Sequence, residues 1–351
     1  MKSVKEELSD LIKPHYVTAI AGMAKNTGKT TVLNSLIDQY RMEGMQLALT
    51  SIGRDGESED VITRAKKPPI HVPKGTLIAT AAGLLPHCSI DRDILETTGM
   101  NTPLGEVVIA RALSDGYVQL AGASTNSGTA SLVAYFGSQR VAKILIDGAF
   151  DRKSILSPKV AEAAILCTGA AMHLDMDEVV RRTAHITRTC MFDLACEGPI
   201  KTISSMPGSV RAALIDEVAG FEPYKPGDPI PPGFSNVFLR GAVTDSVAGK
   251  LANLGKRLNG ISLIAEDSSK LFITQDALDR LHRKGCTIKL MSRVKLAALT
   301  INPFSACGHS FDKDAFLDKM SAESAVPVFN VVLRSADFQS RMENGKWKME
   351  N

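Results

Sequence analysis

Two kinds of segment alternate along the first half of the chain. Some are short, continuous runs of apolar and β-branched residues, which indicate strands buried on both faces of a sheet. These runs cover residues 15–23, 46–53, 117–123, 141–149 and 163–170. Others place apolar residues at helical spacing and predict helices at about 30–44, 104–114 and 129–140. Strands that alternate with helices predict an α/β fold with a doubly wound, mostly parallel sheet.

A change of composition divides the chain. Proline and glycine are frequent from residue 198 to residue 234, as in "FEPYKPGDPIPPGF", and apolar runs then return at 236–243, 261–267, 295–303 and 326–333. We therefore expect a first domain over residues 1–222, a linker over 223–235 and a C-terminal α/β domain over 236–351. The pattern does not decide whether the second half forms its own sheet or extends the first one.

Composition narrows the class of protein. The chain has 351 residues, of which 44% are hydrophobic and 23% are charged, and these ordinary values predict a folded chain. A net charge of +3 and 5% aromatic residues argue against a nucleic-acid partner. No secretory signal and no uncharged apolar run of about 18 residues is found, which predicts a cytoplasmic protein without a membrane partner. The six cysteines form no C-x-x-C pair, which argues against zinc.

The stretch "AGMAKNTGKTTVLN", residues 21–34, joins a predicted strand to a predicted helix. A loop in this position directs its N–H groups at an anion, at the positive end of the helix dipole. Gly28 allows the backbone to approach a phosphate, Lys29 would reach the β- and γ-phosphates, and the Thr30 hydroxyl would bind Mg²⁺. Thr31 could contact the α-phosphate. The alternative is a helix start capped by threonine next to a surface lysine.

The spacing departs from the G-x-x-x-x-G-K-[ST] pattern. Met23 stands where that pattern has glycine, and Gly22 lies one residue earlier. The variant resembles the phosphate-binding loop (P-loop) of the dethiobiotin synthetase branch, within the class that also holds the MinD-like ATPases. The resemblance implies ATP rather than GTP. The signature lysine of the MinD-like proteins would fall at Ala24 and not at Lys25. Lys25 is therefore not predicted to reach across a dimer, although a homodimer stays open.

The predicted nucleotide site comprises the loop and the start of the helix. Its residues are Gly22, Lys25, Asn26, Thr27, Gly28, Lys29, Thr30 and Thr31.

Two carboxylates are expected to complete the magnesium site. Asp147 ends the strand "KILIDGA", where a carboxylate could order the water shell of Mg²⁺, although an Asp-Gly turn would have the same sequence. Asp55 follows the second strand, where it could face the metal and the attacking water, or form a turn. We expect Lys29, Asp55 and Asp147 to be the catalytic residues, and Thr30, Asp55 and Asp147 to hold the metal. Glu57 and Asp151 are weaker candidates.

Further polar segments follow predicted strands. The loop "GASTNSG" offers Ser124, Thr125 and Asn126 to a ligand, or only connects two elements. "CTGA" (167–170) ends a strand at an edge where ligands collect in α/β folds. No N-K-x-D sequence, which would read guanine, is present, and this mildly favours adenine.

Several segments together resemble one family. They are "GMAKNTGKTTVLNSLI", "TSIGRDGE", "ILIDGAFDRKS", "ILCTGAAM", "VFLRGAVTD" and "ALTINPFSACGHSFDKDAFLDKM" with "VPVFNVV". From about Tyr16 to Leu333 the chain looks like the lysine aminomutase reactivase subunit, the KamB-type family of P-loop ATPases. The resemblance implies two partners, a MutS-related ATPase subunit and an adenosylcobalamin-dependent aminomutase.

The resemblance implies a reactivating chaperone. ATP binding and hydrolysis would open the inactivated mutase and let damaged cobalamin leave. The chain has no D-x-H-x-x-G segment, so it is not itself the mutase. The alternative function is an ATP-dependent small-molecule ligase or kinase of the dethiobiotin synthetase type, in which the γ-phosphate goes to a carboxylate.

Overall fold

The computed structural model describes residues 3–52, 69–149, 156–216 and 220–331. It divides the chain into two compact units. Unit 1 comprises Met1–Asp151, Ala163–Thr183 and Ala297–Asn351, and unit 2 comprises Arg152–Glu162 and Ala184–Leu296. The chain therefore passes between the units four times, and each unit is assembled from segments that are distant in sequence.

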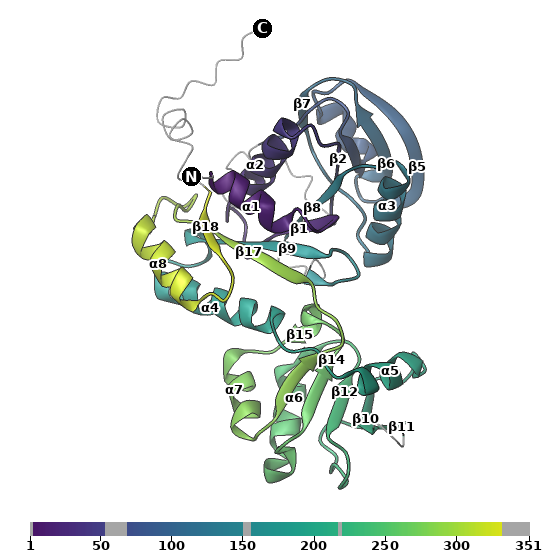
Figure 1. Cartoon of the computed structure of the whole chain (residues 1–351), viewed down its shortest axis with the longest axis vertical. Coiled ribbons are helices and arrows are strands. Elements are labelled where there is room, and N and C mark those ends of the chain that lie inside the picture. Colours follow the sequence, from purple (N-terminus) through teal and green to yellow (C-terminus); the bar gives the residue numbers. More distant parts are fainter. Residues whose placement is uncertain (1–2, 53–68, 150–155, 217–219, 332–351) are drawn as a thin grey trace. The chain divides into compact units, whose positions relative to one another are not determined.

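Unit 1 is built on a nine-stranded sheet, whose strands are coloured by sequence position in Figure 1. In spatial order the strands are β18 (Val328–Asn330), β17 (Lys295–Asn302), β9 (Ala163–Gly169), β1 (Val17–Gly22), β8 (Lys143–Ala149), β2 (Leu47–Ser51), β4 (Leu77–Ala81), β6 (Gly105–Ala112) and β5 (Arg92–Thr102). The strand β1 pairs in parallel with β8 and β9, and β2 pairs in parallel with β8 and β4. At the other end of the sheet β6 pairs antiparallel with β4 and with β5. The expected α/β fold with a mostly parallel sheet is confirmed.

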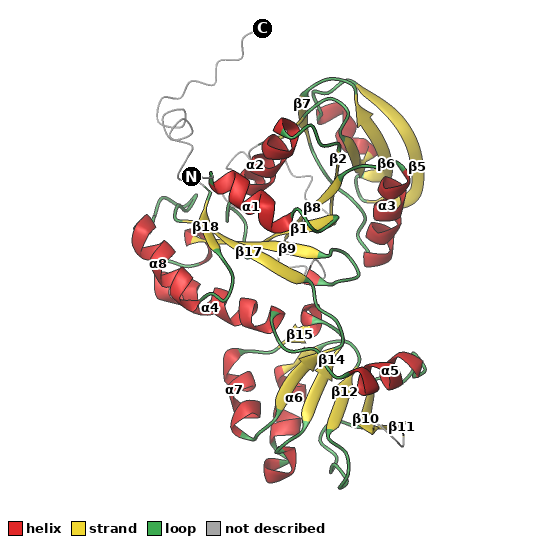
Figure 2. Ribbon diagram, viewed as in Figure 1, coloured by secondary structure: helices red, strands yellow, loops and turns green. Residues whose placement is uncertain are grey.

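Unit 1 also contains helices, drawn in red in Figure 2, one of which precedes β1. They are α1 (Val4–Ile12), α2 (Lys29–Met42), α3 (Asn126–Ser138), α4 (Met176–Cys190) and α8 (Lys313–Glu323). A small sheet pairs β3 (Ile70–Val72) with β7 (Gly116–Val118). The apolar side of α2 places Leu33, Leu36 and Tyr40 in the same buried cluster as Ile20 of β1. This packing fixes the start of α2 directly after the end of β1. The helix α4 crosses from unit 1 into unit 2 after Thr183.

Unit 2 has its own five-stranded sheet. In spatial order its strands are β11 (Gly220–Pro223), β10 (Ala212–Asp216), β12 (Asn236–Leu239), β14 (Ser262–Ala265) and β16 (Thr287–Leu290). The last three are parallel, and β10 is antiparallel to both of its neighbours.

Alternate residues of the strands in unit 2 enter two different apolar clusters. Val237 and Leu263 join the cluster that contains residues of α6 (Asp245–Ala252) and α7 (Gln275–Arg283). Phe238 and Ile264 join the cluster that contains Ile203 of α5 (Glu197–Ser205). Because successive side chains of a strand point to opposite faces, α5 covers one face of the sheet and α6 with α7 covers the other.

The observed division of the chain differs from the expected one at residues 223–235. The strand β10 and most of β11 precede residue 223 but pair within unit 2, whereas β17 and β18 follow residue 235 but join the sheet of unit 1. Part of the second half thus forms a sheet of its own, and another part extends the sheet of unit 1. Proline and glycine mark local turns, but the sheet that a strand joins depends on partners distant in the sequence.

Two predicted elements were wrong in type or length. Residues 104–114 were expected to be helical, but β6 occupies Gly105–Ala112 between β4 and β5. The β-branched run Val107, Val108 and Ile109 lies in these two ladders, where such side chains pack well. The run at 117–123 is strand only to Val118, and Leu120 and Ala121 continue as buried, irregular backbone. Within the described ranges, every helix is too short or too polar to span a lipid bilayer.

Candidate functional site

The loop between β1 and α2 contains two left-handed residues and leads into the start of a helix. The strand ends at Gly22 and the helix begins at Lys29. Asn26 (φ 61°) and Gly28 (φ 90°) adopt left-handed conformations, which favour glycine and tolerate asparagine. The first turn of the helix is closed by the bond from Val32 N to Gly28 O (3.0 Å). The N–H groups before Val32 thus lie outside the helical ladder, at the positive end of α2.

Gly22 allows the lysine of the motif to fold back over the loop. A Cβ atom at Gly22 would lie 2.6 Å from Lys29 Cδ and 2.7 Å from Thr27 Oγ1. Only a residue without a side chain fits beneath this lysine in its present position. The glycine that the sequence places one residue earlier than in the common pattern therefore still has a steric role at this loop.

Lys29, the first residue of α2, lies close to Asp147 of β8, the strand beside β1. Lys29 Nζ lies 3.9 Å from Asp147 Oδ1, and the two side chains are only 13% and 10% exposed. The parallel register pairs Ile20 with Asp147, so the carboxylate stands beside the end of β1. The structure thus brings together the lysine and one of the two carboxylates that the sequence singled out. At 3.9 Å the pair is an ion pair rather than a direct hydrogen bond.

Cys167 lies on β9, beside the end of β1 and close to Lys29 and Asp147. Its carbonyl oxygen accepts a hydrogen bond from Met23 N (2.8 Å), and the register pairs it with Gly22. Burial raises the pKa of the Cys167 thiol to about 12, and nearby Lys29 lowers this pKa less than burial raises it. The thiol is therefore protonated at neutral pH and contributes no charge to the site.

Asn302, at the end of β17, holds the loop from a distant part of the sequence. Its Nδ2 donates to Asn26 O (2.9 Å), and its Oδ1 accepts from Phe304 N (3.1 Å). Within the loop, Thr27 Oγ1 donates to Ala24 O (3.0 Å). The sequence analysis did not single out Asn302. The Asn-Pro pair directly after an apolar strand was the signal available for it.

The end of β2 and the loop before α3 lie beside the main chain of Asp147 in β8. Ile52 N donates to Asp147 O (3.0 Å), and Gly122 N donates to Ser51 Oγ (2.9 Å). A Cβ atom at Gly122 would lie 2.1 Å from Ser51 O, so the "GASTNSG" loop approaches the end of β2 closely. In that loop Thr125 Oγ1 accepts from Gly128 N (3.1 Å) and caps α3. The Thr125 hydroxyl thus has a structural role.

The remaining predicted site residues have different positions. Thr30 and Thr31 are half-buried in the first turn of α2, and Lys25 is exposed on the loop. Asp55, with the weaker candidates Glu57 and Asp151, lies outside the described residues.

The side chain of Thr168 and the main chain of Ala170, in the "CTGA" segment (167–170), make contacts within the protein. Thr168 Oγ1 is 2.8 Å from Thr183 Oγ1 and buried. His309 Nε2 lies 2.7 Å from Ala170 O, which brings the loop after β17 against the end of β9. A Cβ atom at Gly169 would lie 2.4 Å from Asn302 O, so the loop after β17 approaches this edge closely.

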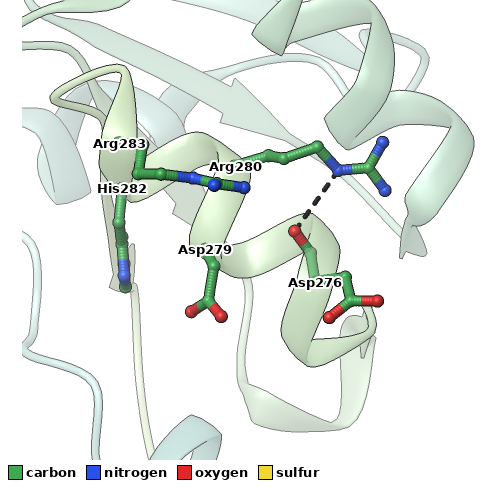
Figure 3. A pocket seen from close by; sticks show the side chains of 5 residues that line it. All are labelled: Asp276, Asp279, Arg280, His282 and Arg283. Carbon is green, nitrogen blue, oxygen red and sulfur yellow. Dashed lines mark hydrogen bonds between the residues drawn. The ribbon is translucent and has the colours of Figure 1, made fainter.

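A hollow in unit 2 is lined by side chains of α7 alone, as Figure 3 shows. The only hydrogen bond drawn there joins Arg280 Nε to Asp276 O (3.3 Å), within the same helix. The residues of the described ranges include no group of three His, Cys, Asp or Glu side chains suited to a metal. The candidate site is therefore the loop of unit 1.

Comparisons with known proteins add little. Neither the protein-family models nor the curated proteins gave a match. Among solved structures, the chain is similar to the signal recognition particle receptor FtsY from Elizabethkingia anophelis, at 12% sequence identity and a TM-score of 0.26. This similarity covers 90% of this chain and 71% of that one. A similarity at this level supports no conclusion about function.

Proposed function

We propose that unit 1 binds a nucleoside triphosphate, with its phosphates in the loop of residues 22–31, and hydrolyses it. The observation that carries the proposal is the position of Lys29. Its side chain folds over Gly22 at the positive end of α2, with its Nζ 3.9 Å from a carboxylate on the neighbouring strand. An ammonium, a helix start and a left-handed glycine in one loop are the parts that hold a β,γ-phosphate.

Magnesium fits the residues that are present. Mg²⁺ in nucleotide sites keeps several water molecules and is bound through one or two protein ligands together with the phosphates. Thr30 and Asp147 would supply these ligands. The ion would neutralise the charge that develops on the phosphates.

Different groups of the chain would orient the phosphates, offset their charge and position the lysine and the metal. The N–H groups at the start of α2 would orient the phosphates, and Lys29 would offset charge on the γ-phosphate. Asp147 would hold Lys29 and the metal in place. We propose ATP as the nucleotide, supported by the absence of a guanine-reading N-K-x-D sequence in the chain.

For the cellular role we propose a reactivating chaperone subunit that acts with a MutS-related ATPase on an adenosylcobalamin-dependent aminomutase. The support is the set of motifs that resemble the reactivase family. Unit 2 has its own sheet and core, so it could contact a partner while unit 1 binds the nucleotide.

Isothermal titration with MgATP and MgGTP tests the nucleotide proposal. Lys29→Ala should abolish binding and leave the fold intact, and the exposed Lys74→Ala is the matched control. Asp147→Asn should bind nucleotide but lose magnesium-dependent hydrolysis. Normal MgATP binding by Lys29→Ala would refute the site, and a preference for MgGTP would refute the choice of adenine.

The chaperone role needs its own experiment. ATP hydrolysis would be measured with the protein alone, and then with an adenosylcobalamin aminomutase and its MutS-related companion, while cobalamin release is followed. Faster hydrolysis together with release supports the reactivase role. Tight MgATP binding without any stimulation would contradict it.

A further inference from the structure

Two arginines stand directly opposite each other at one edge of the sheet in unit 2. Arg211 precedes β10 and Arg240 follows β12, and these two strands are neighbours in the sheet (Figure 1). The antiparallel register that pairs Ala212 with Leu239 continues to the arginines, since Arg240 N donates to Arg211 O (2.7 Å). Directly opposite residues of an antiparallel pair direct their side chains to the same face, with Cβ atoms about 5 Å apart. Both guanidinium groups therefore belong to one face of the sheet.

Packing positions the guanidinium of Arg240 on the face that α5 covers. Arg240 lies two residues after Phe238, which belongs to the same apolar cluster as Ile203 of α5. Arg240 Cζ lies 5.6 Å from the centre of the Phe238 ring. The turn of residues 207–210 approaches the same group, because a Cβ atom at Gly208 would lie 3.9 Å from Arg240 Nη1. A cation over an aromatic ring is attracted to it, so this side chain has a preferred position.

The charges of the two arginines are not neutralised by the described part of the chain. Neither guanidinium forms a hydrogen bond or an ion pair with a described residue, and Arg240 Nε is buried without a partner. Glu266, which follows β14, is the acid beside Arg240 in the register, but its Oε2 accepts from Gly241 N (2.9 Å). Like charges directly opposite each other destabilise a pair of strands. An anion bound between the arginines would remove this cost.

The arginine pair lies at the edge of the sheet where a ligand is expected. Arg240 follows the carboxyl end of β12, which is parallel to β14. In open α/β sheets, ligands bind outside the carboxyl ends of the parallel strands. Guanidinium groups present paired N–H donors that match the oxygen atoms of phosphate and carboxylate. Because Glu266 would repel an anion, the anion would lie on the other side of Arg240, towards Arg211.

We propose that Arg211 and Arg240 form an oxyanion-binding site in unit 2, which takes the phosphate or carboxylate group of a small molecule. Arg240, half-buried on Phe238, would supply a fixed donor group, and the exposed Arg211 would close on the anion from the neighbouring strand. The inference does not depend on the proposed nucleotide function, because it uses only residues of unit 2. It goes beyond that function, since it gives unit 2 a ligand of its own.

Nuclear magnetic resonance of the full chain, labelled with ¹⁵N, tests the proposal by titration with inorganic phosphate at constant ionic strength. The Arg240 Nε–H signal reports on the site itself and should shift and saturate as phosphate binds. Acetate, titrated in the same way, provides the carboxylate, and the tighter of the two probes identifies the preferred group. The same titration of Lys29→Ala should give the same shift, which separates this site from the proposed nucleotide site.

Matched variants show whether charge at this place decides binding. Gly208→Asp would put a carboxylate beside Arg240 and should weaken phosphate binding about tenfold or more, whereas Gly208→Asn has the same shape without the charge and should bind like the wild type. Arg211→Gln removes one guanidinium and should also weaken binding about tenfold or more. Arg257→Gln, which removes an exposed guanidinium before β14 at the opposite edge of the sheet, should leave binding unchanged. Thermal unfolding would check that each variant is folded.

A saturable shift that Arg211→Gln and Gly208→Asp weaken, and that Gly208→Asn and Arg257→Gln keep, supports the proposal. If the two arginines only cover apolar surface and face solvent, neither probe would produce a saturable shift of the Arg240 signal, and that result would overturn it. Equal binding by Gly208→Asp and Gly208→Asn would overturn it as well. Loss of the shift in Lys29→Ala would mean that the Arg240 signal reports on anion binding in unit 1, which would refute a separate site in unit 2.

Discussion

Asn302→Ala should weaken nucleotide binding although Asn302 is 276 positions from Asn26, the loop residue that it contacts. The substitution removes the bond from Asn302 Nδ2 to Asn26 O (2.9 Å), which is worth about 1 kcal/mol net. Asn26 is held in a left-handed conformation (φ 61°), which without support costs on the order of 1 kcal/mol. A ligand would then have to order the loop itself.

The two contributions give a loss of about 1–2 kcal/mol in binding free energy, or roughly a 5–30-fold rise in the Kd for MgATP. Calorimetry would measure the Kd, and thermal unfolding would check that the fold remains. Asn302→Asp is the informative companion. It keeps the acceptor for Phe304 N but turns a carboxylate oxygen toward Asn26 O, so it should bind still more weakly than Asn302→Ala. A Kd within about twofold of wild type in both variants would refute the reasoning.

Three further outcomes are expected. Gly22→Ala should raise the Kd for MgATP about tenfold or more while the melting temperature changes little, because the new methyl group displaces only the flexible Lys29 side chain, and calorimetry with thermal unfolding measures both. Lys143→Met should lower the free energy of unfolding by about 3 kcal/mol or more in denaturant titrations, because it leaves three main-chain carbonyls at and after the end of α1 without their donor, at about 1–3 kcal/mol each. Cys307 should be alkylated at pH 8 while Cys167 is protected in mass spectrometry. Because the pKa of Cys167 is raised from 9.0 to about 12, its contribution to stability is present below pH 9 and is lost by about 1.4 kcal/mol per pH unit between pH 9 and pH 12.

Each of these results has a contrary outcome. An unaltered Kd for Gly22→Ala would show that Lys29 can bind phosphate from another position. An unfolding free energy of Lys143→Met equal to that of wild type would mean that water replaces the lysine at the carbonyls. Rapid alkylation of Cys167 in the folded protein would show that the end of β9 beside the loop opens to solvent.

Local sequence was sufficient for much of unit 1. The strand before Gly22, the helix after Gly28 and the strand that ends near Asp147 were predicted from periodicity, because a buried parallel strand and an amphipathic helix each impose a spacing on neighbouring residues. Lys29 and Asp147 were also expected to belong to one site, since parallel strands bring their carboxyl ends to one edge, but their ion pair was not predicted.

Prediction from the same kind of pattern failed where the pattern fits both a helix and a strand. The segment at 104–114 has enough alanine and enough spacing for a helix, yet it forms β6 because strands on both sides offer ladder partners. The predicted boundary between the units was wrong for a related reason. The sheet that a strand joins depends on pairing partners that lie far away in the sequence.

The sequence by itself thus determined the loop between β1 and α2, the helix that follows it and the α/β class, because these depend on contacts between residues a few positions apart. Only the tertiary structure decided that β17 and β18 return to the first sheet, that Asn302 holds Asn26, and that Ser157 is bonded to Asp267 in unit 2. Apart from the pairing of β18 with its neighbour β17, these contacts join residues more than a hundred positions apart. They form because folding buries apolar surface and requires a partner for each buried polar group.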